Sequence, residues 1–305
     1  MIKQSLSRLD FSRREVLRFG LAVPIVAVTS NMFTGGAAHA GTHHLHDEVR
    51  GLERRYGATI GLYARNLKTG QCLRHRDNQR FPILSVFKTL AVAAVLRDRD
   101  VRGEFLAERV RYRQDEIVEN SPITSTHVAD GMTVRELCDA ALRYSDNTAG
   151  NLLLRAIGGP NGLTAFARSI GDHRTELDRW EPDLNDAFPR DQRDTTTPAA
   201  IAKSYGRLLV GSGLMPDDQG LLRGWMLDNQ TSNERFRAGL PQGWRLADKT
   251  GAGDYGTLND VGVAWDRTGT PLLIAALSRM DRADDKSNNA LMSELAALTA
   301  RAIAW

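Results

Sequence analysis

The stretch SVFKTLAVAAVL, residues 85–96, places apolar side chains on every face of a helix and interrupts them with Lys88. A helix that is apolar all round belongs in the centre of a protein. The sequence carries further helix start and stop signals downstream, at Thr133–Glu136, Asn147, Gly158–Pro160 and Thr197–Pro198. We therefore expect an all-α domain over residues 81–227, built around the buried helix.

Short segments with strand character flank this helical region on both sides. The expected strands are Thr59–Arg65, Gln71–His75, Arg245–Lys249, Asn259–Trp265 and Pro271–Ser278. An amphipathic helix precedes the first pair, with Leu45 and Tyr56 on its apolar face, and a closing helix covers Asn289–Ile303. Ends of this kind can pair into one five-stranded antiparallel sheet flanked by helices. The predicted class is α+β, with residues 41–80 and 228–305 forming a discontinuous α/β domain and the functional site at its interface with the all-α domain.

The first forty residues have the features of an export signal. Arg13 and Arg14 form a twin-arginine pattern, a short apolar run covers residues 19–28, and Ala38-His39-Ala40 matches a cleavage site. This segment accounts for the whole net charge of +3, so residues 41–305 carry no net charge. A neutral mature chain offers no general attraction to nucleic acid. We expect export, cleavage near Ala40 and no stable membrane insertion afterwards.

The two cysteines and the N-terminal histidines give no separate site. Cys72 falls in an expected strand and Cys138 in an expected helix, and we expect two unpaired thiols. His43, His44 and His46 hint at a metal site, but no partner cluster follows them, so we expect a tail and no metal.

Ser85 and Lys88 have the spacing of a nucleophile and its proton acceptor. Ser85 opens the buried helix, where unsatisfied N–H groups favour a developing anion. Lys88 lies three residues on and shares its face, and burial disfavours a charged lysine. The alternative is an N-capping serine beside a surface lysine.

Two further triplets supply polar groups for a reaction. Ser145-Asp146-Asn147 lies between two helices, where Ser145 can pass a proton to a leaving nitrogen and Asn147 can bind an amide, although all three residue types also favour helix N-caps. Lys249-Thr250-Gly251 ends an expected strand and can bind a substrate carboxylate. A second Lys-Thr-Gly, residues 68–70, sits at a hairpin turn and indicates no such site.

The segment from Arg179 to Asp194 has little helical or strand pattern. Opposite charges at its ends can clasp a compact Ω-loop. Within it, Glu181 can act as a general base for water and Asn185 can hold that water. The alternative is a solvated acidic loop residue.

Together these motifs resemble the class A serine β-lactamases. The resemblance extends to Asp130–Cys138, Asn147–Pro160, Asp178–Pro182 and Arg193–Ala200, and it covers essentially all of residues 42–305. It implies the serine β-lactamase and DD-peptidase fold and a cofactor-free, monomeric hydrolase that opens the β-lactam ring of small-molecule antibiotics. Penicillins are the first expected substrates and cephalosporins the second.

The resemblance also implies a role for each motif. Ser85 is the acylated nucleophile, Lys88 and Glu181 share the duty of acylation base, and Glu181 activates the deacylating water with Asn185. Ser145 protonates the lactam nitrogen, and Asn147 binds the substrate amide. The remaining implied groups are the oxyanion hole from the N–H groups of Ser85 and Ala252, the substrate-binding Lys249, Thr250 and Gly251, and the loop clasp Arg179 and Asp194.

The chain differs from the common family pattern at two positions. Leu258 stands where many members have an arginine, and the resemblance implies that Arg235 supplies the substitute guanidinium. Asn120 stands where an aromatic residue often gates the site.

Two other protein classes share part of this pattern. A penicillin-binding DD-peptidase shares most motifs but lacks the loop carboxylate. A non-catalytic β-lactam sensor domain lacks it too and is tethered to a membrane helix. The resemblance further implies a cis bond between Glu181 and Pro182 and a periplasmic or secreted enzyme.

Overall fold

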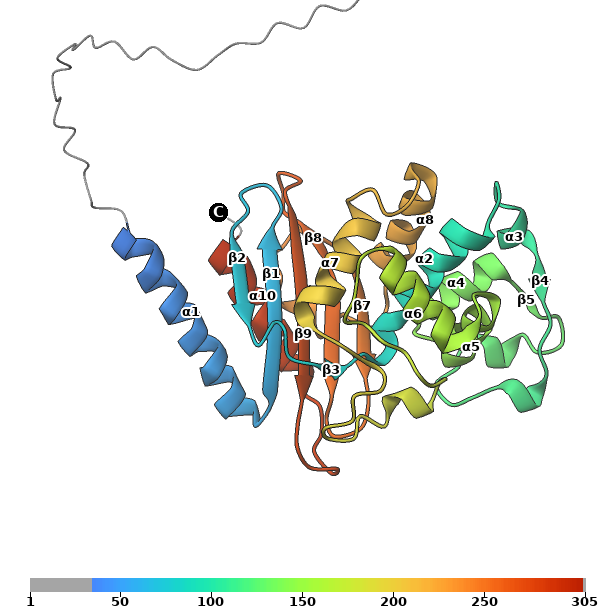
Figure 1. Cartoon of the computed structure of the whole chain (residues 1–305), viewed down its shortest axis with the longest axis horizontal. Coiled ribbons are helices and arrows are strands. Elements are labelled where there is room, and N and C mark those ends of the chain that lie inside the picture. The colour runs from blue at the N-terminus through green and yellow to red at the C-terminus, as the bar shows by residue number, and fades with distance from the viewer. Residues whose placement is uncertain (1–34, 304–305) are drawn as a thin grey trace, which may run out of the picture.

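The computed structural model describes residues 35–303 (Figure 1). The α-helices are α1 (Gly35–Tyr56), α2 (Phe87–Ala94), α3 (Glu104–Ala107), α4 (Val134–Arg143), α5 (Asn147–Ala156), α6 (Gly159–Ser169), α7 (Pro198–Leu209), α8 (Pro216–Leu227), α9 (Phe236–Gly239) and α10 (Asn289–Ile303). The strands are β1 (Thr59–Asn66), β2 (Cys72–His75), β3 (Phe81–Pro82), β4 (Arg109–Val110), β5 (Met132–Thr133), β6 (Thr195–Thr196), β7 (Arg245–Ala252), β8 (Leu258–Trp265) and β9 (Pro271–Arg279).

A five-stranded antiparallel sheet runs through the molecule in the order β2-β1-β9-β8-β7. Strand β1, near the start of the chain, pairs with β9, near its end, from Thr59 opposite Arg279 to Asn66 opposite Leu272. The expectation that the two ends of the chain share one sheet is therefore confirmed. The turn between β1 and β2 contains Gly70, whose φ of 79° is accessible to glycine at little cost.

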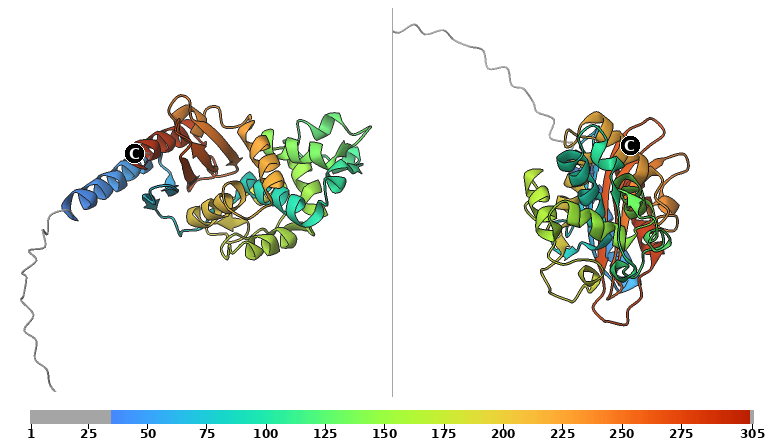
Figure 2. Two further views of the ribbon diagram at one scale, coloured as in Figure 1. Left: turned by 90° about the horizontal axis from the view of Figure 1, so that it is seen from above. Right: turned by 90° about the vertical axis from the view of Figure 1, so that its right-hand side faces the viewer.

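Helices cover both faces of this sheet. Figure 2 shows α1 and α10 together on one side and the other long helices on the opposite side. Val49 of α1 and Leu295 of α10 belong to one buried apolar cluster, and Leu90 of α2 and Tyr205 of α7 belong to the other. The sheet thus separates two cores, and the α+β class predicted from the sequence is confirmed.

The helix predicted from residues 85–96 lies in the second core, and every residue of α2 is buried. It differs from the prediction at its ends. Leu84–Val86 form a 3₁₀ turn, η1, and Val95–Arg99 form a π-helical turn, η2. Ser85 therefore sits in a tight turn that leads into α2, rather than in the helix itself. Lys88 is fully buried within α2.

The predicted helix starts are confirmed by their capping contacts. The Thr133 hydroxyl accepts a hydrogen bond from the Glu136 N–H, and the Glu136 carboxylate accepts one from the Thr133 N–H, which completes a capping box. Thr197 caps α7, with Pro198 as the first helical residue. These caps fix the residues at which α4 and α7 begin.

Two element ends differ from the prediction. Helix α1 begins at Gly35, ahead of the expected apolar positions that start at Leu45. Strand β7 continues through the Lys-Thr-Gly motif to Ala252, because pairing with β8 extends as far as Leu258. The whole motif thus lies inside the edge strand, whereas the expected strand included only Lys249 of the motif.

Most of the expected export signal, residues 1–34, lies outside the described residues, and residues 35–40 belong to α1. In the described part, no helix has the length and apolar character needed to cross a membrane. Cys72 on β2 and Cys138 in α4 are both free thiols, and Cys138 is buried. The proposed domain boundaries stay a prediction.

Candidate active site

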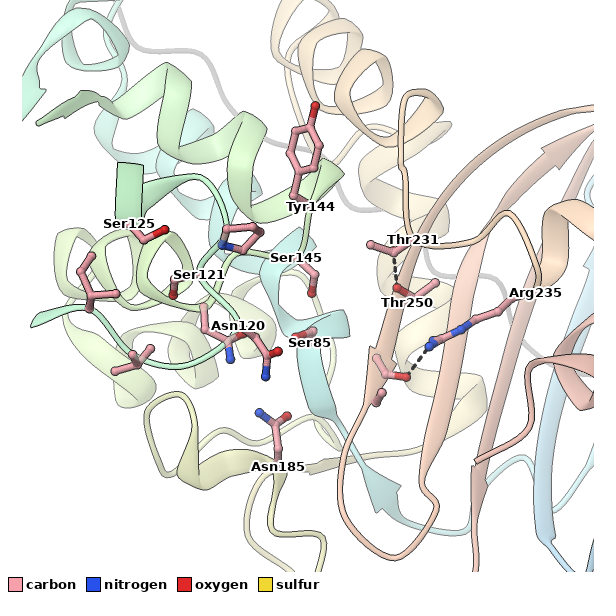
Figure 3. A pocket seen from close by; sticks show the side chains of 16 residues that line it. Ser85, Asn120, Ser121, Ser125, Tyr144, Ser145, Asn185, Thr231, Arg235 and Thr250 are labelled. Atoms are coloured by element: carbon pink, nitrogen blue, oxygen red, sulfur yellow. Dashed lines mark hydrogen bonds between the residues drawn. The ribbon is translucent and has the colours of Figure 1, made fainter. Parts of the chain in front are cut away.

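A cavity of about 650 Å³ opens where β7 faces the helical part of the molecule (Figure 3). Its walls include eight residues singled out from the sequence: Ser85, Ser145, Asn147, Asn185, Arg235, Thr250, Gly251 and Ala252. Three more, Lys88, Glu181 and Lys249, are buried and contact lining residues. The fold therefore brings residues from five separate stretches of sequence into one site.

Ser85 lies between two groups that can accept its proton. Its Oγ is 2.9 Å from Lys88 Nζ and donates to Glu181 Oε1 at 3.2 Å. Lys88 Nζ also lies 3.0 Å from Glu181 Oε1, and neither side chain is exposed to solvent. Burial lowers the pKa of Lys88, and the Glu181 carboxylate opposes that shift. Both groups are within hydrogen-bond reach of the hydroxyl that a general base must deprotonate.

Helix α5 and the turn before it hold Lys88 from the other side. Lys88 Nζ donates to the Ser145 carbonyl at 2.8 Å and to Asn147 Oδ1 at 2.7 Å. Ser145 has a φ of 61°, a strained value for a residue other than glycine, which turns its carbonyl toward the lysine. Asp146 caps α5 and accepts from the backbone N–H groups of Ile123 and Thr124, which ties this turn to the opposite wall.

Ser145 Oγ accepts a hydrogen bond from a second buried lysine. Lys249 Nζ, on β7, donates to Ser145 Oγ at 3.0 Å and to the Thr250 carbonyl at 2.9 Å. Burial lowers the pKa of Lys249 well below its usual range, and the neighbouring charge of Lys88 acts in the same direction. A hydroxyl held between the site and a buried amine is placed to relay a proton.

The edge strand approaches Ser85 so closely that position 251 requires glycine. A Cβ on Gly251 would lie 2.7 Å from Leu84 Cβ and 3.3 Å from Ser85 N. The backbone of β7 therefore runs directly beside the turn that carries Ser85. Ala252, the next residue, is exposed at the cavity wall. This arrangement places the backbone of Ser85 and Ala252 at the same part of the cavity.

Arg235 reaches β7 from the segment before α9. Its Nη1 donates to the carbonyls of Gly251 at 3.0 Å and Asn259 at 3.3 Å, and its Nε donates to Asn289 Oδ1. Burial lowers the pKa of Arg235 below that of a solvated arginine. Thr250 Oγ1 lies 2.5 Å from Thr231 Oγ1 beside it. The wall on this side of the cavity thus combines cationic and hydroxyl groups, which suit an anionic substrate group.

The loop that carries Glu181 is held at its ends by the expected ion pair. Arg179 Nε donates to Asp194 Oδ2 at 2.6 Å, and Arg179 Nη1 donates to Asp186 Oδ2 at 2.7 Å. The Glu181–Pro182 bond is cis, in agreement with the expectation. Asn185 Nδ2 donates to Glu181 Oε2 at 2.5 Å, so the two residues assigned to the water lie together.

Sequence reasoning missed two residues of α5 that position the site. Asn151 exchanges hydrogen bonds of 2.9 Å with the backbone N–H and carbonyl of Glu181. A Cβ on Gly150 would lie 2.8 Å from Lys88 Cε, so a glycine leaves room for the lysine. Asn151 lies four residues after Asn147, on the same helix face, and that spacing is the sequence signal for its role.

The N-terminal histidine hypothesis falls partly outside the described residues, because the side chains of His43 and His44 are not among them. Residues 45–303 bring together no group of three or more histidine, cysteine, aspartate or glutamate side chains that fits a metal ion. His46 instead lies against His75, with ring centroids 6.0 Å apart.

Comparison with known proteins identifies the family. Residues 44–303 match the β-lactamase enzyme family. A β-lactamase from Streptomyces fradiae is 49% identical over 296 residues, which span 96% of this chain and 97% of the relative. β-Lactamase FAR-1 from Nocardia farcinica is 47% identical over 81% of this chain and 79% of its own length.

Solved structures agree with these relatives. The β-lactamase from Streptomyces albus G has 46% identity and a TM-score of 0.84, with 85% of this chain and 99% of that chain covered. An ancestral class A β-lactamase has 46% identity and a TM-score of 0.81, with 85% of this chain and all of its own chain covered. The chain therefore belongs to the β-lactamase enzyme family, as a serine hydrolase of class A.

Proposed function

We propose that this enzyme hydrolyses β-lactam antibiotics through an acyl-enzyme on Ser85, which a water activated by Glu181 then releases. The single observation that carries the proposal is the position of Glu181 Oε1. It lies 3.2 Å from Ser85 Oγ and 3.0 Å from Lys88 Nζ in a site closed to solvent. A carboxylate there can serve both the serine and a water that attacks the acyl carbon.

In the acylation half-reaction, Ser85 Oγ bonds to the lactam carbonyl carbon and passes its proton to Lys88 or Glu181. The backbone N–H groups of Ser85 and Ala252 stabilise the negative carbonyl oxygen. The carbon–nitrogen bond of the ring then breaks, and Ser145 supplies the proton that the departing nitrogen needs. Its contact with Lys249 at 3.0 Å supports this relay, because the lysine can replace that proton.

In the deacylation half-reaction, Glu181 takes a proton from water as the water oxygen bonds to the ester carbon. Asn185, whose amide is 2.5 Å from Glu181 Oε2, holds the same water. The bond between the ester carbon and Ser85 Oγ then breaks, and Ser85 Oγ takes the proton that Glu181 received from the water, which restores the hydroxyl and the carboxylate. The clasp between Arg179 and Asp194 keeps the carboxylate in place during both steps.

Substrate binding uses the two sides of the cavity. The substrate carboxylate lies near Thr250, Lys249 and Arg235, and Asn147 binds the side-chain amide. Penicillins are the primary substrates in this proposal and cephalosporins the secondary ones. In this proposal the enzyme is exported, loses its signal by cleavage near Ala40 and acts as a monomer.

The test is turnover of benzylpenicillin and of a chromogenic cephalosporin by the chain that lacks residues 1–40. We expect sustained hydrolysis of both, faster for the penicillin. Ser85→Ala should lose nearly all turnover, because it removes the hydroxyl that contacts both Lys88 and Glu181. Wild-type turnover in Ser85→Ala would exclude the serine mechanism. A stoichiometric burst without turnover in the unmodified chain would favour a DD-peptidase or sensor instead.

A further inference from the structure

A second cavity, of about 320 Å³, lies beside the loop that carries Glu181. One wall is the tip of that loop, residues 187–192, and the other is formed by residues 79–82 and the end of β9. This cavity shares no lining residue with the active-site cavity. Its volume is at the lower end of the range for small-molecule sites.

Three arginines line the second cavity, and two of them have no partner. Among the residues that the structure describes, the guanidinium groups of Arg190 and Arg279 make no hydrogen bond or ion pair. Arg279 is half-buried, and its Nε is shielded from solvent without an acceptor. An unsatisfied buried donor is unfavourable, and an anion in the cavity would relieve that cost.

No carboxylate within residues 35–303 pairs with either of these two guanidinium groups. The acidic residue in the lining, Asp191, already accepts from Arg193 Nη2 at 2.7 Å. Arg80, the third arginine, donates to Thr195 Oγ1 at 2.7 Å and lies 3.8 Å from Glu176. The cavity therefore keeps an excess of positive charge, which favours an anionic ligand.

The lining also has an apolar part, which comes from Phe81, Pro82, Phe188, Pro189 and Met280, beside the polar Gln79, Gln192 and Thr195. A bare inorganic anion would leave this surface without a partner. We propose that the second cavity binds a small organic carboxylate, with its charged end held by Arg190 and Arg279 and its apolar end against Phe188 and Pro189.

Such a ligand joins the loop tip to the sheet, because Arg190 belongs to the loop and Arg279 to β9. The loop tip also contacts a second loop at the active site, since the ring of Phe188 packs edge-on against Tyr255, with centroids 6.0 Å apart. A ligand that binds only when the loop tip lies against the end of β9 stabilises that arrangement. Amide hydrogen exchange in residues 186–192 is therefore expected to slow when the cavity is occupied.

The test uses benzoate as the probe, with neutral benzamide as its uncharged counterpart. Calorimetric titration of the wild-type chain measures the dissociation constant, and hydrogen exchange with and without benzoate locates the site. We expect benzoate to bind and to slow exchange in residues 186–192, and benzamide to do neither. Neither measurement uses β-lactam turnover, so the result stands apart from the proposed function.

Two substitutions test the assignment of the charged end. Arg190→Ala is on the exposed loop tip and Arg279→Gln keeps polar volume on β9, so each is expected to fold. Each should weaken benzoate binding by about tenfold or more, the loss typical of a charge-assisted hydrogen bond. The control Arg135→Ala removes an exposed charge from α4 and should change nothing. An unchanged dissociation constant in both cavity variants, or protection confined to residues 245–256 beside Ser85, would overturn the proposal.

Discussion

Lys88 makes four polar contacts through one nitrogen, within 3.0 Å of Ser85 Oγ, the Ser145 carbonyl, Asn147 Oδ1 and Glu181 Oε1. An ammonium group has three protons, so not all four atoms can accept from it together. When Lys88 is neutral, its lone pair can accept the Ser85 proton while two N–H groups hold Ser145 and Asn147. Burial, which lowers the pKa of Lys88, favours that state. The site thus places two groups that can accept a proton beside Ser85 Oγ.

The position of Lys88 depends on the absence of a side chain at residue 150. We expect Gly150→Ala to push Lys88 Cε aside, because the new Cβ would lie 2.8 Å from it. A displacement of about 1 Å at a reacting group can lower the rate roughly 100-fold. Pre-steady-state acylation kinetics measure this loss directly.

The matched control for that substitution is Gly220→Ala in α8, where an added Cβ meets no atom within 4 Å. Alanine is the better helix former, so this variant should keep full activity and gain slightly in stability. Equal acylation rates for Gly150→Ala and the wild type would show that Lys88 tolerates displacement.

At the scale of elements, the loop from Arg179 to Asp194 shows what the sequence could and could not predict. Its ends could be predicted, because opposite charges flank a segment without helical or strand periodicity. The hydrogen bonds that hold Glu181 could not be predicted, because they come from Asn151, which lies outside the loop in helix α5. The extension of β7 over residues 250–252 was not predicted either, since it depends on pairing with β8 rather than on local composition.

The loop clasp yields a second prediction. Arg179→Ala removes the hydrogen bonds to both Asp186 and Asp194, so residues 179–194 should exchange amide hydrogens faster and be cleaved more readily by protease. Deacylation should slow roughly 10- to 100-fold as Glu181 loses its fixed position.

Arg193→Ala is the control for the clasp, because Arg193 forms an exposed pair with Asp191 in the same loop. Exposed pairs of this kind contribute little, so its kinetics should match the wild type. If the two arginine variants behave alike, the pair between Arg179 and Asp194 has no special role in the loop.

At the scale of the whole molecule, the fold followed from the sequence because its signals are mutually consistent. One helix is apolar on every face and strand patterns mark both ends of the chain, which together require a central helix and a sheet closed by both ends. The buried polar pair Asp248 and Asp260, on β7 and β8, had no such signal. The alternation of apolar and polar residues along a strand does not show which of its acidic side chains are buried.

This pair makes the stability of the fold depend on pH. Burial raises the pKa of Asp260 well above its usual range, and the Asp248 carboxyl raises it further. An aspartate in the unfolded chain has a pKa of about 3.9. Above that pH the unfolded chain releases a proton that the folded chain retains. The free energy of unfolding therefore falls as the pH rises through the folded-state pKa.

We expect Asp260→Asn to remove this pH-dependent loss of stability, because an asparagine amide can donate a hydrogen bond to Asp248 without a shared proton. Urea unfolding of both chains between pH 4 and pH 8 measures it. The stability of the variant relative to the wild type should increase with pH, and Asp248→Asn should show the same trend. A difference that stays constant over this range would mean that the pair does not retain a proton on folding.

The central claim of the mechanism is that Glu181 activates the water that releases the acyl-enzyme. The most direct measurement is mass spectrometry of Glu181→Ala after mixing with benzylpenicillin, beside the wild type and the control Glu176→Ala. We expect the Glu181 variant to gain the mass of one penicillin and stall, while the wild type and the control turn over without accumulating an adduct. Continued turnover by Glu181→Ala with no accumulated acyl-enzyme would contradict the mechanism.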